Sequence, residues 1–147
     1  MRIAIASDHG GYHLKADIAD LITRMGHVCD DLGTHSAEAV DYPDYARTVA
    51  NGVAEGAYDR GILICGTGQG MAIAANKIKG VRAAVCQDEY SARMSRGHND
   101  ANVLCLGERV LGSGLAEHIV KVWLETDFSG EHRHRRRLGK IAALEPR

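Results

Sequence analysis

The chain is poor in the features that mark secreted, membrane-spanning or nucleic-acid-binding proteins. Its 147 residues include two prolines and no low-complexity segment or internal repeat, so we expect one domain, 1–147, without a linker. No apolar run approaches the roughly 20 residues of a membrane span, and the opening MRIAIASDHGG lacks the apolar core of a signal peptide. The formal net charge is −1, so no overall field attracts nucleic acid or an anionic membrane.

Cysteine is also scarce, and its spacing argues against the commonest metal sites. The four cysteines form no CxxC pair, so we expect no structural zinc site. Three of them, Cys65, Cys86 and Cys105, lie in or at the end of strand-like runs. Mostly buried thiols of this kind indicate a reduced, cytoplasmic protein. The sequence assigns no role beyond packing to Cys29, Cys86 or Cys105.

Short apolar runs alternate with helical patterns along the chain. The predicted strands are 2–7, 27–33, 60–65, 81–86 and 102–107. The predicted helices are 14–25, 41–56, 70–77, 88–97, 114–127 and, very basic, about 131–143. Strands that alternate with helices indicate βαβ crossovers and a parallel sheet with both faces covered. We therefore predict a three-layer αβα, Rossmann-like α/β domain with about five parallel strands and a C-terminal basic helix.

Such sheets bind ligands at the carboxyl ends of their strands. At these positions the chain has Asp8 and His9 after the first strand, Cys65 after the third and Arg109 after the fifth. Cys65 is followed by a glycine-rich loop, in the stretch ICGTGQGMAIAAN. These residues are the first candidates for a functional site.

The glycine-rich loop matches none of the common phosphate-binding motifs. It lacks the GxGxxG spacing after a first strand and the lysine of a P-loop, and Met71 stands where a cysteine phosphatase needs arginine. Its backbone N–H groups and the following helix could instead hold an anion, or an oxyanion that forms during a reaction. The same groups would stabilise a thiolate at Cys65. The loop alone leaves open a plain tight turn beside a buried cysteine.

Further polar residues strengthen the functional interpretation. His98 and Asn99 precede the fifth strand, and Arg133 and Arg137 share one face of the last helix. Each has a plain alternative, since Asp8 can cap a helix, His98 can be a loop residue and the run RHRRR can be a solvated face. Taken together, the imidazoles, amide, thiol and guanidiniums favour a site for a phosphorylated ligand.

The motifs SDHGG, DYPDYA, CGTGQG, GVRAAVC and GHNDANVLCLG, with the C-terminal RHRRR, resemble the ribose-5-phosphate isomerase type B family. That family also contains the galactose-6-phosphate isomerase subunits, and the resemblance covers nearly the whole chain. It implies interconversion of ribose 5-phosphate and ribulose 5-phosphate through a cis-enediolate, without metal or cofactor.

The resemblance also implies roles for individual residues. Cys65 would be the base, since 71–75 offer no carboxylate, and His98 would be the acid that opens the furanose ring. Thr67 would hydrogen-bond the thiol or the enediolate. Substrate-binding roles are implied for Asp8, His9, Tyr42, Gly66, Thr67, Gly68, Gln69, Gly70, Asn99, Arg109, Arg133 and Arg137.

The resemblance further implies a homodimer or tetramer with sites built from both chains. The basic last helix is well placed to reach a partner. In one respect the chain departs from the family, because GEHRHRRRLGKI carries an extra residue and extra arginines. Arg133 and Arg137 match the family pattern for the phosphate, but a shift of one residue nominates Arg135 or Arg136.

Three other functions stay open at this point. A hexose 6-phosphate isomerase, for allose or galactose, would use the same fold and chemistry. A non-catalytic phosphate-binding module would keep the loop and arginines but would need neither Cys65 nor His98. A nucleic-acid patch at RHRRR is disfavoured by the near-neutral charge and the absence of interleaved aromatics.

Overall fold

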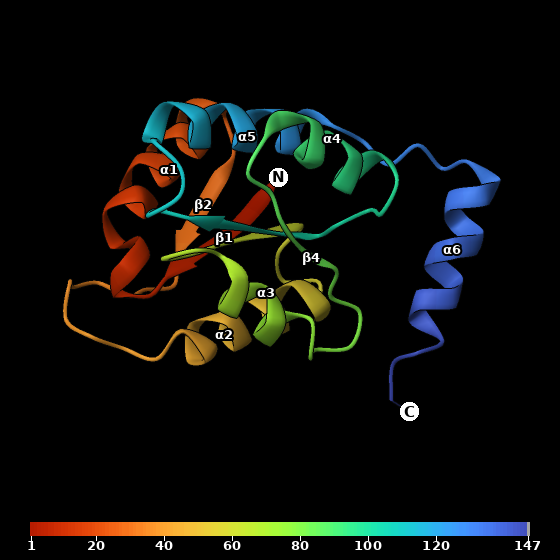
Figure 1. Cartoon of the computed structure of the whole chain (residues 1–147), viewed down its shortest axis with the longest axis horizontal. Helices are drawn as coiled ribbons and strands as arrows, with labels where there is room; N and C mark the ends of the chain where they lie inside the picture. The colour runs from red at the N-terminus through yellow and green to blue at the C-terminus, as the bar shows by residue number, and fades with distance from the viewer. Residues whose placement is uncertain (147) are drawn as a thin grey trace.

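A five-stranded parallel sheet forms the centre of the computed structural model, which describes residues 1–146 (Figure 1). The strand order is β2-β1-β3-β5-β4, and each neighbouring pair is parallel. The strands are β1 (Arg2–Ser7), β2 (Val28–Asp31), β3 (Arg60–Cys65), β4 (Ala83–Val85) and β5 (Val103–Gly107). The predicted α/β Rossmann-like architecture is confirmed.

Helices cover both faces of the sheet. They are the short 3-10 helix η1 (His9–Gly11), α1 (Tyr12–Arg24), α2 (Tyr42–Ala54), α3 (Gln69–Ala75), α4 (Glu89–Gly97), α5 (Ser113–Glu125) and α6 (His132–Ala142). α1, α4 and α5 pack on one face, and α2 and α3 on the other (Figure 1). Along β3, Ile62 and Ile64 face the first group, and Leu63 and Cys65 face the second. Cys65 therefore lies on the α2–α3 side of the sheet.

The ends of several elements differ from the predicted ranges by one or two residues. β4 contains only three residues, although the apolar pattern predicts a strand over 81–86. At its start, the N–H of Arg82 donates to the side chain of Asn102 (2.7 Å), which replaces a ladder hydrogen bond. β2 ends at Asp31, whose carboxylate accepts from the N–H of Gly33 (2.9 Å) and begins a turn.

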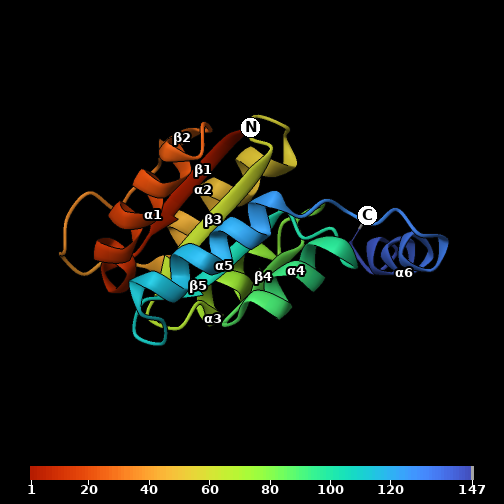
Figure 2. The same ribbon diagram turned by 90° about the horizontal axis from the view of Figure 1, so that it is seen from above.

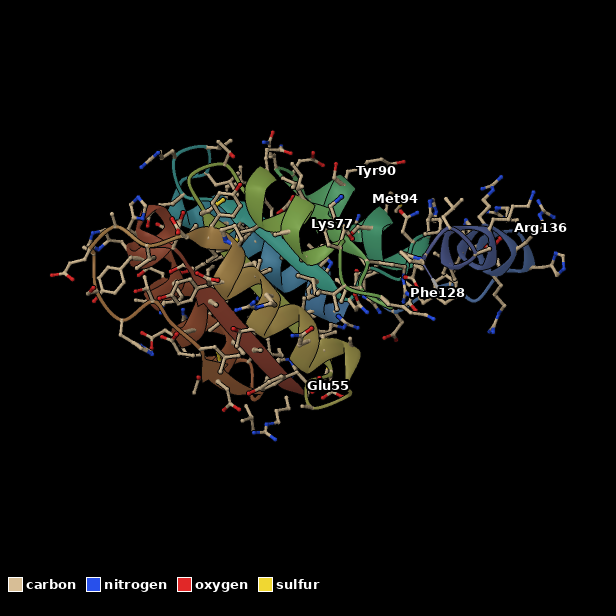
Figure 3. All side chains as sticks on the ribbon, turned by 90° about the horizontal axis from the view of Figure 1, so that it is seen from below. Glu55, Lys77, Tyr90, Met94, Phe128 and Arg136 are labelled. Carbon is tan, nitrogen blue, oxygen red and sulfur yellow. The ribbon has the colours of Figure 1, made fainter. Side chains whose placement is uncertain are left out.

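Helix α6 stands apart from the three layers. It lies beyond the amino ends of the strands in both ribbon views (Figures 1 and 2). Its only buried residue is His134, because its sequence HRHRRRLGKIA offers no apolar stripe. The side chain of Arg136 points away from the body of the molecule (Figure 3). None of the helices within 1–146 is long and apolar enough to cross a membrane.

Candidate active site

Cys65 is the last residue of the central strand β3, and its side chain is 5% exposed. The N–H of Gly68 donates to the Cys65 Sγ at 3.1 Å. This contact depends on the turn, because Gly68 has a φ of +83° and a Cβ there would lie 3.1 Å from the carbonyl carbon of Leu106. Only glycine fits both conditions, so the spacing of the loop glycines aims an N–H at the sulfur.

Arg109 is fixed against the same loop. Its N–H donates to the carbonyl oxygen of Gly66 (3.1 Å), and the preceding N–H of Glu108 donates to the carbonyl of Cys65 (2.9 Å). A Cβ on Gly66 would lie 3.1 Å from Arg109 Nη1, so the guanidinium covers this glycine. The turn after β5 thus places a positive charge beside the thiol loop.

Asp8 and the first turn border the loop on its other side. Asp8 is 7% exposed and its N–H donates to the carbonyl of Ile64 (3.2 Å). Its carboxylate accepts from the N–H of Gly10 (2.8 Å), so the capping alternative is correct for this residue. A Cβ on Gly10 would lie 3.1 Å from the nitrogen of Gly66, which shows how closely the two loops approach.

His9 has a defined donor in this arrangement. The N–H of Val40 donates to His9 Nδ1 at 3.2 Å. In the neutral imidazole the proton is therefore on Nε2, which leaves that nitrogen free to donate a hydrogen bond. His9 can serve as a donor to a substrate oxygen.

The remaining predicted loop residues lie at the same edge. The ring of Tyr42 packs on Gly70, where a Cβ would come within 2.6 Å of the Tyr42 Cζ. Thr67 Oγ1 accepts from the N–H of Gln69 (3.3 Å), and the Thr67 backbone packs on Gly107. These contacts complete a group at the carboxyl edge of the sheet. We call it the thiol group, and it consists of Asp8, His9, Tyr42, Cys65, Gly66, Thr67, Gly68, Gln69, Gly70 and Arg109.

His98 and Asn99 lie at the opposite side of the sheet, near the amino ends of the strands. They follow α4 and precede β5, whose first residue Val103 pairs with Gly61 at the start of β3. Cys65 lies four residues further along β3, or roughly 13 Å in an extended strand. Within one chain the structure does not bring His98 and Asn99 to the thiol.

α6 is attached to the same opposite edge through His134. The imidazole rings of His98 and His134 lie 4.3 Å apart, centroid to centroid, with their planes at 34°. His134 is 3% exposed, and its Nδ1 is 2.7 Å from Ser129 Oγ. Burial lowers the pKa of His134, and the nearby His98 and Arg133 lower it further. His134 thus packs against the His98 ring as an uncharged imidazole near neutral pH.

The arginines of α6 differ in their surroundings. Arg133 pairs with Glu131, and Arg135 Nε donates to the carbonyl of Gly130 (2.7 Å). Arg136 points outward from the far side of the helix (Figure 3). Arg133 and Arg137 are exposed and one helical turn apart. We call His98, Asn99, Arg133 and Arg137 the His98 group.

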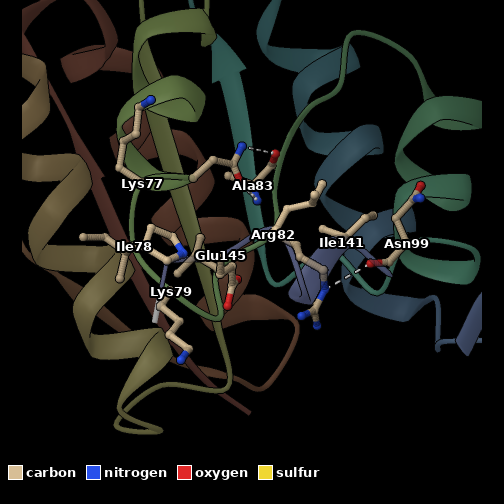
Figure 4. Close-up of a pocket in the computed structure, with 12 residues that line it drawn as sticks. Lys77, Ile78, Lys79, Arg82, Ala83, Asn99, Ile141 and Glu145 are labelled. Carbon is tan, nitrogen blue, oxygen red and sulfur yellow. Dashed lines mark hydrogen bonds between the residues drawn. The ribbon is translucent and has the colours of Figure 1, made fainter. Parts of the chain in front are cut away.

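A pocket of about 700 Å³ lies beside this second group and does not include Cys65 (Figure 4). The segment after α3, the start of β4, Asn99 and residues near the C-terminus line it. Arg82 lies in its wall and donates from Nε to the carbonyl of Asn99 at 3.2 Å (Figure 4). The cation beside Asn99 therefore comes from the segment before β4.

Three residues that contact the loop of His98 and Asn99 were not predicted from the sequence. Arg82, Arg96 and His134 all pack or hydrogen-bond there. The signal for Arg96 was its position two residues before His98, directly ahead of the motif GHNDANVLCLG. The partners of Arg82 and His134 come from distant segments, which spacing along the chain does not indicate.

Comparison with known proteins identifies the family of the chain. The family described as Ribose/Galactose Isomerase matches residues 3–141. Ribose-5-phosphate isomerase B of Escherichia coli is 50% identical over 146 residues, which cover 99% of this chain and 97% of that protein.

Two solved structures have nearly the same fold. Ribose-5-phosphate isomerase B of Clostridium thermocellum has a TM-score of 0.96 at 57% identity, over 98% of this chain and 97% of that one. The Mycoplasma genitalium enzyme, solved with bound ribulose-5-phosphate, has a TM-score of 0.93 at 44% identity, over 97% and 94%. With a family match along almost its whole length and relatives this similar, the chain belongs to the ribose/galactose isomerase family.

Proposed function

We propose that this protein interconverts ribose 5-phosphate and ribulose 5-phosphate, with Cys65 as the base. The observation that carries the proposal is the N–H of Gly68 pointing at Cys65 Sγ, at the ligand-binding edge of a parallel sheet. The relatives named above, including one solved with ribulose-5-phosphate, support the choice of substrate. The Arg109 guanidinium beside the loop suits a phosphorylated ligand.

The proposed proton transfer takes place at this loop. The Cys65 thiolate removes the proton from C2 of the open-chain aldose, the C2–H electrons form the C1–C2 double bond, and negative charge moves to O1. Return of the proton to C1, with the O2 hydroxyl proton passing to O1, gives the ketose. Backbone N–H groups of Gly66 to Gly70 stabilise the charge that develops on oxygen. Thr67 contributes its hydroxyl to the same region.

The position of the His98 group leads us to propose that the site is shared between two chains. His98, Asn99, Arg133 and Arg137 lie beyond the amino ends of the strands, away from their own Cys65. In a homodimer they would meet the partner's Cys65. His98 would then donate a proton to the ring oxygen as the furanose opens, while the arginines hold the phosphate.

A cytoplasmic location is part of the same proposal. A thiolate base requires a compartment in which cysteines stay reduced, and Cys29, Cys65, Cys86 and Cys105 are all free thiols. Sugar phosphates are small charged molecules, and the proposed partners are such a substrate and a second copy of the chain.

A hexose 6-phosphate isomerase is the second candidate. The matching family covers ribose and galactose isomerases, and both would use the same proton transfer. A longer substrate needs more room between the loop and the phosphate-binding arginines. In the proposed dimer that distance is set by the interface, because the two groups would face each other across it.

Isomerase assays with ribose 5-phosphate and allose 6-phosphate, on wild type and Cys65→Ala, test the proposal. We expect higher kcat/KM for the pentose, no effect of a chelator, and a loss of kcat of about 10²–10⁴-fold in Cys65→Ala. Substrate affinity, measured by calorimetry, should stay nearly unchanged. Full turnover in Cys65→Ala would refute the role of the base, and a preference for allose 6-phosphate would support the second candidate.

A further inference from the structure

Asp100 lies between two arginines next to the His98 segment. Its Oδ1 accepts from Arg96 Nη1 (2.9 Å), and its Oδ2 accepts from Arg82 Nη2 (3.2 Å). Arg96 comes from α4, whereas Arg82 precedes β4. One carboxylate thus joins two segments on either side of the loop that carries His98 and Asn99.

The same two arginines also hold the backbone of the loop. Arg82 Nε donates to the carbonyls of Asp100 (2.9 Å) and Asn99 (3.2 Å), and Arg96 Nη1 donates to the carbonyl of Ala101 (2.7 Å). Three consecutive carbonyls therefore have guanidinium donors. Such charge-assisted bonds restrict a segment that would otherwise be an exposed loop.

Arg96 is a rigid anchor for this arrangement. It is 6% exposed, its Nε donates to the carbonyl of Thr126 (3.2 Å), and its guanidinium lies 5.9 Å from the centroid of the Trp123 ring. Asp100 supplies the negative charge that this buried cation needs. Asp100 also has a φ of +45°, a left-handed conformation that the surrounding bonds must maintain.

We propose that Asp100, through Arg82 and Arg96, is a positioning residue that fixes the backbone of His98 and Asn99 for the reaction. The inference rests on the proposed function, in which these two side chains act on the sugar. Asp100 itself touches no reacting atom. Its effect is geometric, since a displacement of about 1 Å in a catalytic group can lower the rate by about 10²-fold.

Asp100→Asn is the central variant, and Asp30→Asn is its control. Asparagine keeps the size of the side chain and tolerates a positive φ, so the change removes mainly the charge. Asp30 pairs with Arg2 at 2.9 Å and is 31% exposed, close to the 2.9 Å and 35% of the Asp100 pair with Arg96. Asp30 lies on β2, away from both site groups.

The first measurement is amide hydrogen exchange of the full-length protein. We expect the amides of 97–102 to exchange about tenfold faster in Asp100→Asn than in wild type, with no change there in Asp30→Asn. Unchanged exchange of 97–102 in Asp100→Asn would overturn the proposal. This readout needs no turnover, so it decides the positioning role even where the wild-type protein fails to isomerise ribose 5-phosphate.

The second measurement is a mutant cycle in kcat/KM. We expect Asp100→Asn to lower kcat/KM about 10–100-fold in the wild-type background. In a background with His98→Asn and Asn99→Ala, the same change should lower it less than about twofold, because the groups it positions are gone. Equal losses in both backgrounds, or wild-type kcat/KM in Asp100→Asn, would contradict the proposal. Where that background has no detectable turnover, the exchange result decides.

Discussion

Gly68 has a backbone φ of +83°, and its N–H donates to Cys65 Sγ. The sequence indicated that a glycine in this loop would turn an N–H inward, and the structure identifies which one faces the sulfur. The role of Tyr42 was different. Its ring packs on Gly70, a contact that links α2 to α3 and that no local pattern indicates.

Gly68→Ala should therefore lower both stability and activity. The left-handed backbone and the close approach to Leu106 predict a loss of about 1–2 kcal/mol in the free energy of unfolding. Turnover should also fall, because the N–H moves away from the sulfur. Urea unfolding and kcat measure the two effects. Gly114→Ala is the control, since Gly114 has an ordinary φ and open space around it. A wild-type free energy of unfolding and a wild-type kcat in Gly68→Ala would contradict the requirement for glycine in this turn.

His134 should make stability depend on pH. Its pKa is lowered in the folded state, chiefly by burial, so the unfolded chain binds the proton more readily. Stability should be fully present above the unfolded pKa of about 6.5 and should decline as the pH falls toward and through the folded pKa. His134→Gln should remove part of this decline. The free energy of unfolding in urea is compared at pH 7.5 and pH 5 for wild type and His134→Gln. An identical pH dependence in the two proteins would be evidence against the contribution of His134.

At the scale of elements, the end of α5 is capped only in part by its own sequence, where Thr126 Oγ1 donates to the carbonyl of Val122 (2.6 Å). Its last turn contains no basic residue, and its capping residue Thr126 has an extended backbone. Arg60 of β3 instead donates from Nη1 to the carbonyls of Trp123 (2.8 Å) and Leu124 (3.1 Å). Burial lowers the pKa of Arg60 to about 10, so it stays protonated at neutral pH. A strand residue thus completes the end of a helix 63 and 64 positions later.

Arg60→Leu should destabilise the fold by about 2–3 kcal/mol, because it leaves two buried helix carbonyls without donors. The free energy of unfolding in urea measures the loss. Arg24→Leu is the matched change on an exposed arginine, which pairs with Glu117 at 3.8 Å. It should stay within about 0.5 kcal/mol of wild type. Equal effects of the two changes would argue against the capping role.

At the scale of the whole molecule, the thiol group and the His98 group lie at opposite edges of the sheet. α6 reaches outward from the second edge and buries only His134. In the proposed dimer, each chain would supply the thiol group to one site and the His98 group to the other. We therefore expect two sites in an isologous dimer, each with Cys65 from one chain and His98 from the other.

Mixing two inactive variants tests the shared site. Cys65→Ala and His98→Asn, unfolded together and refolded as an equal mixture, should recover about a quarter of wild-type activity. Half of the dimers are then mixed, and each mixed dimer has one intact site. Each variant refolded alone is the control. Mixing that restores no activity, with mixed dimers confirmed by mass spectrometry, would show that each site lies within a single chain.

The sequence by itself determined the parallel sheet, its helical cover and the placement of Asp8, His9, Cys65 with its loop, and Arg109 at the carboxyl ends of the strands. These depend on local information: apolar runs, helical spacing, and chemical groups that directly follow a strand. The ends of β2 and β4 differed because side chains of Asp31 and Asn102 take over backbone hydrogen bonds.

Only the tertiary structure decided which residues hold the second group. The order of elements already places His98 and Asn99 just before β5, at the amino ends of the strands. The contacts that hold them come from Arg82, Arg96 and His134, far apart along the chain or on different elements. The physical reason is that each residue type fixes its own side-chain chemistry, whereas contacts between distant segments depend on the path of the whole chain.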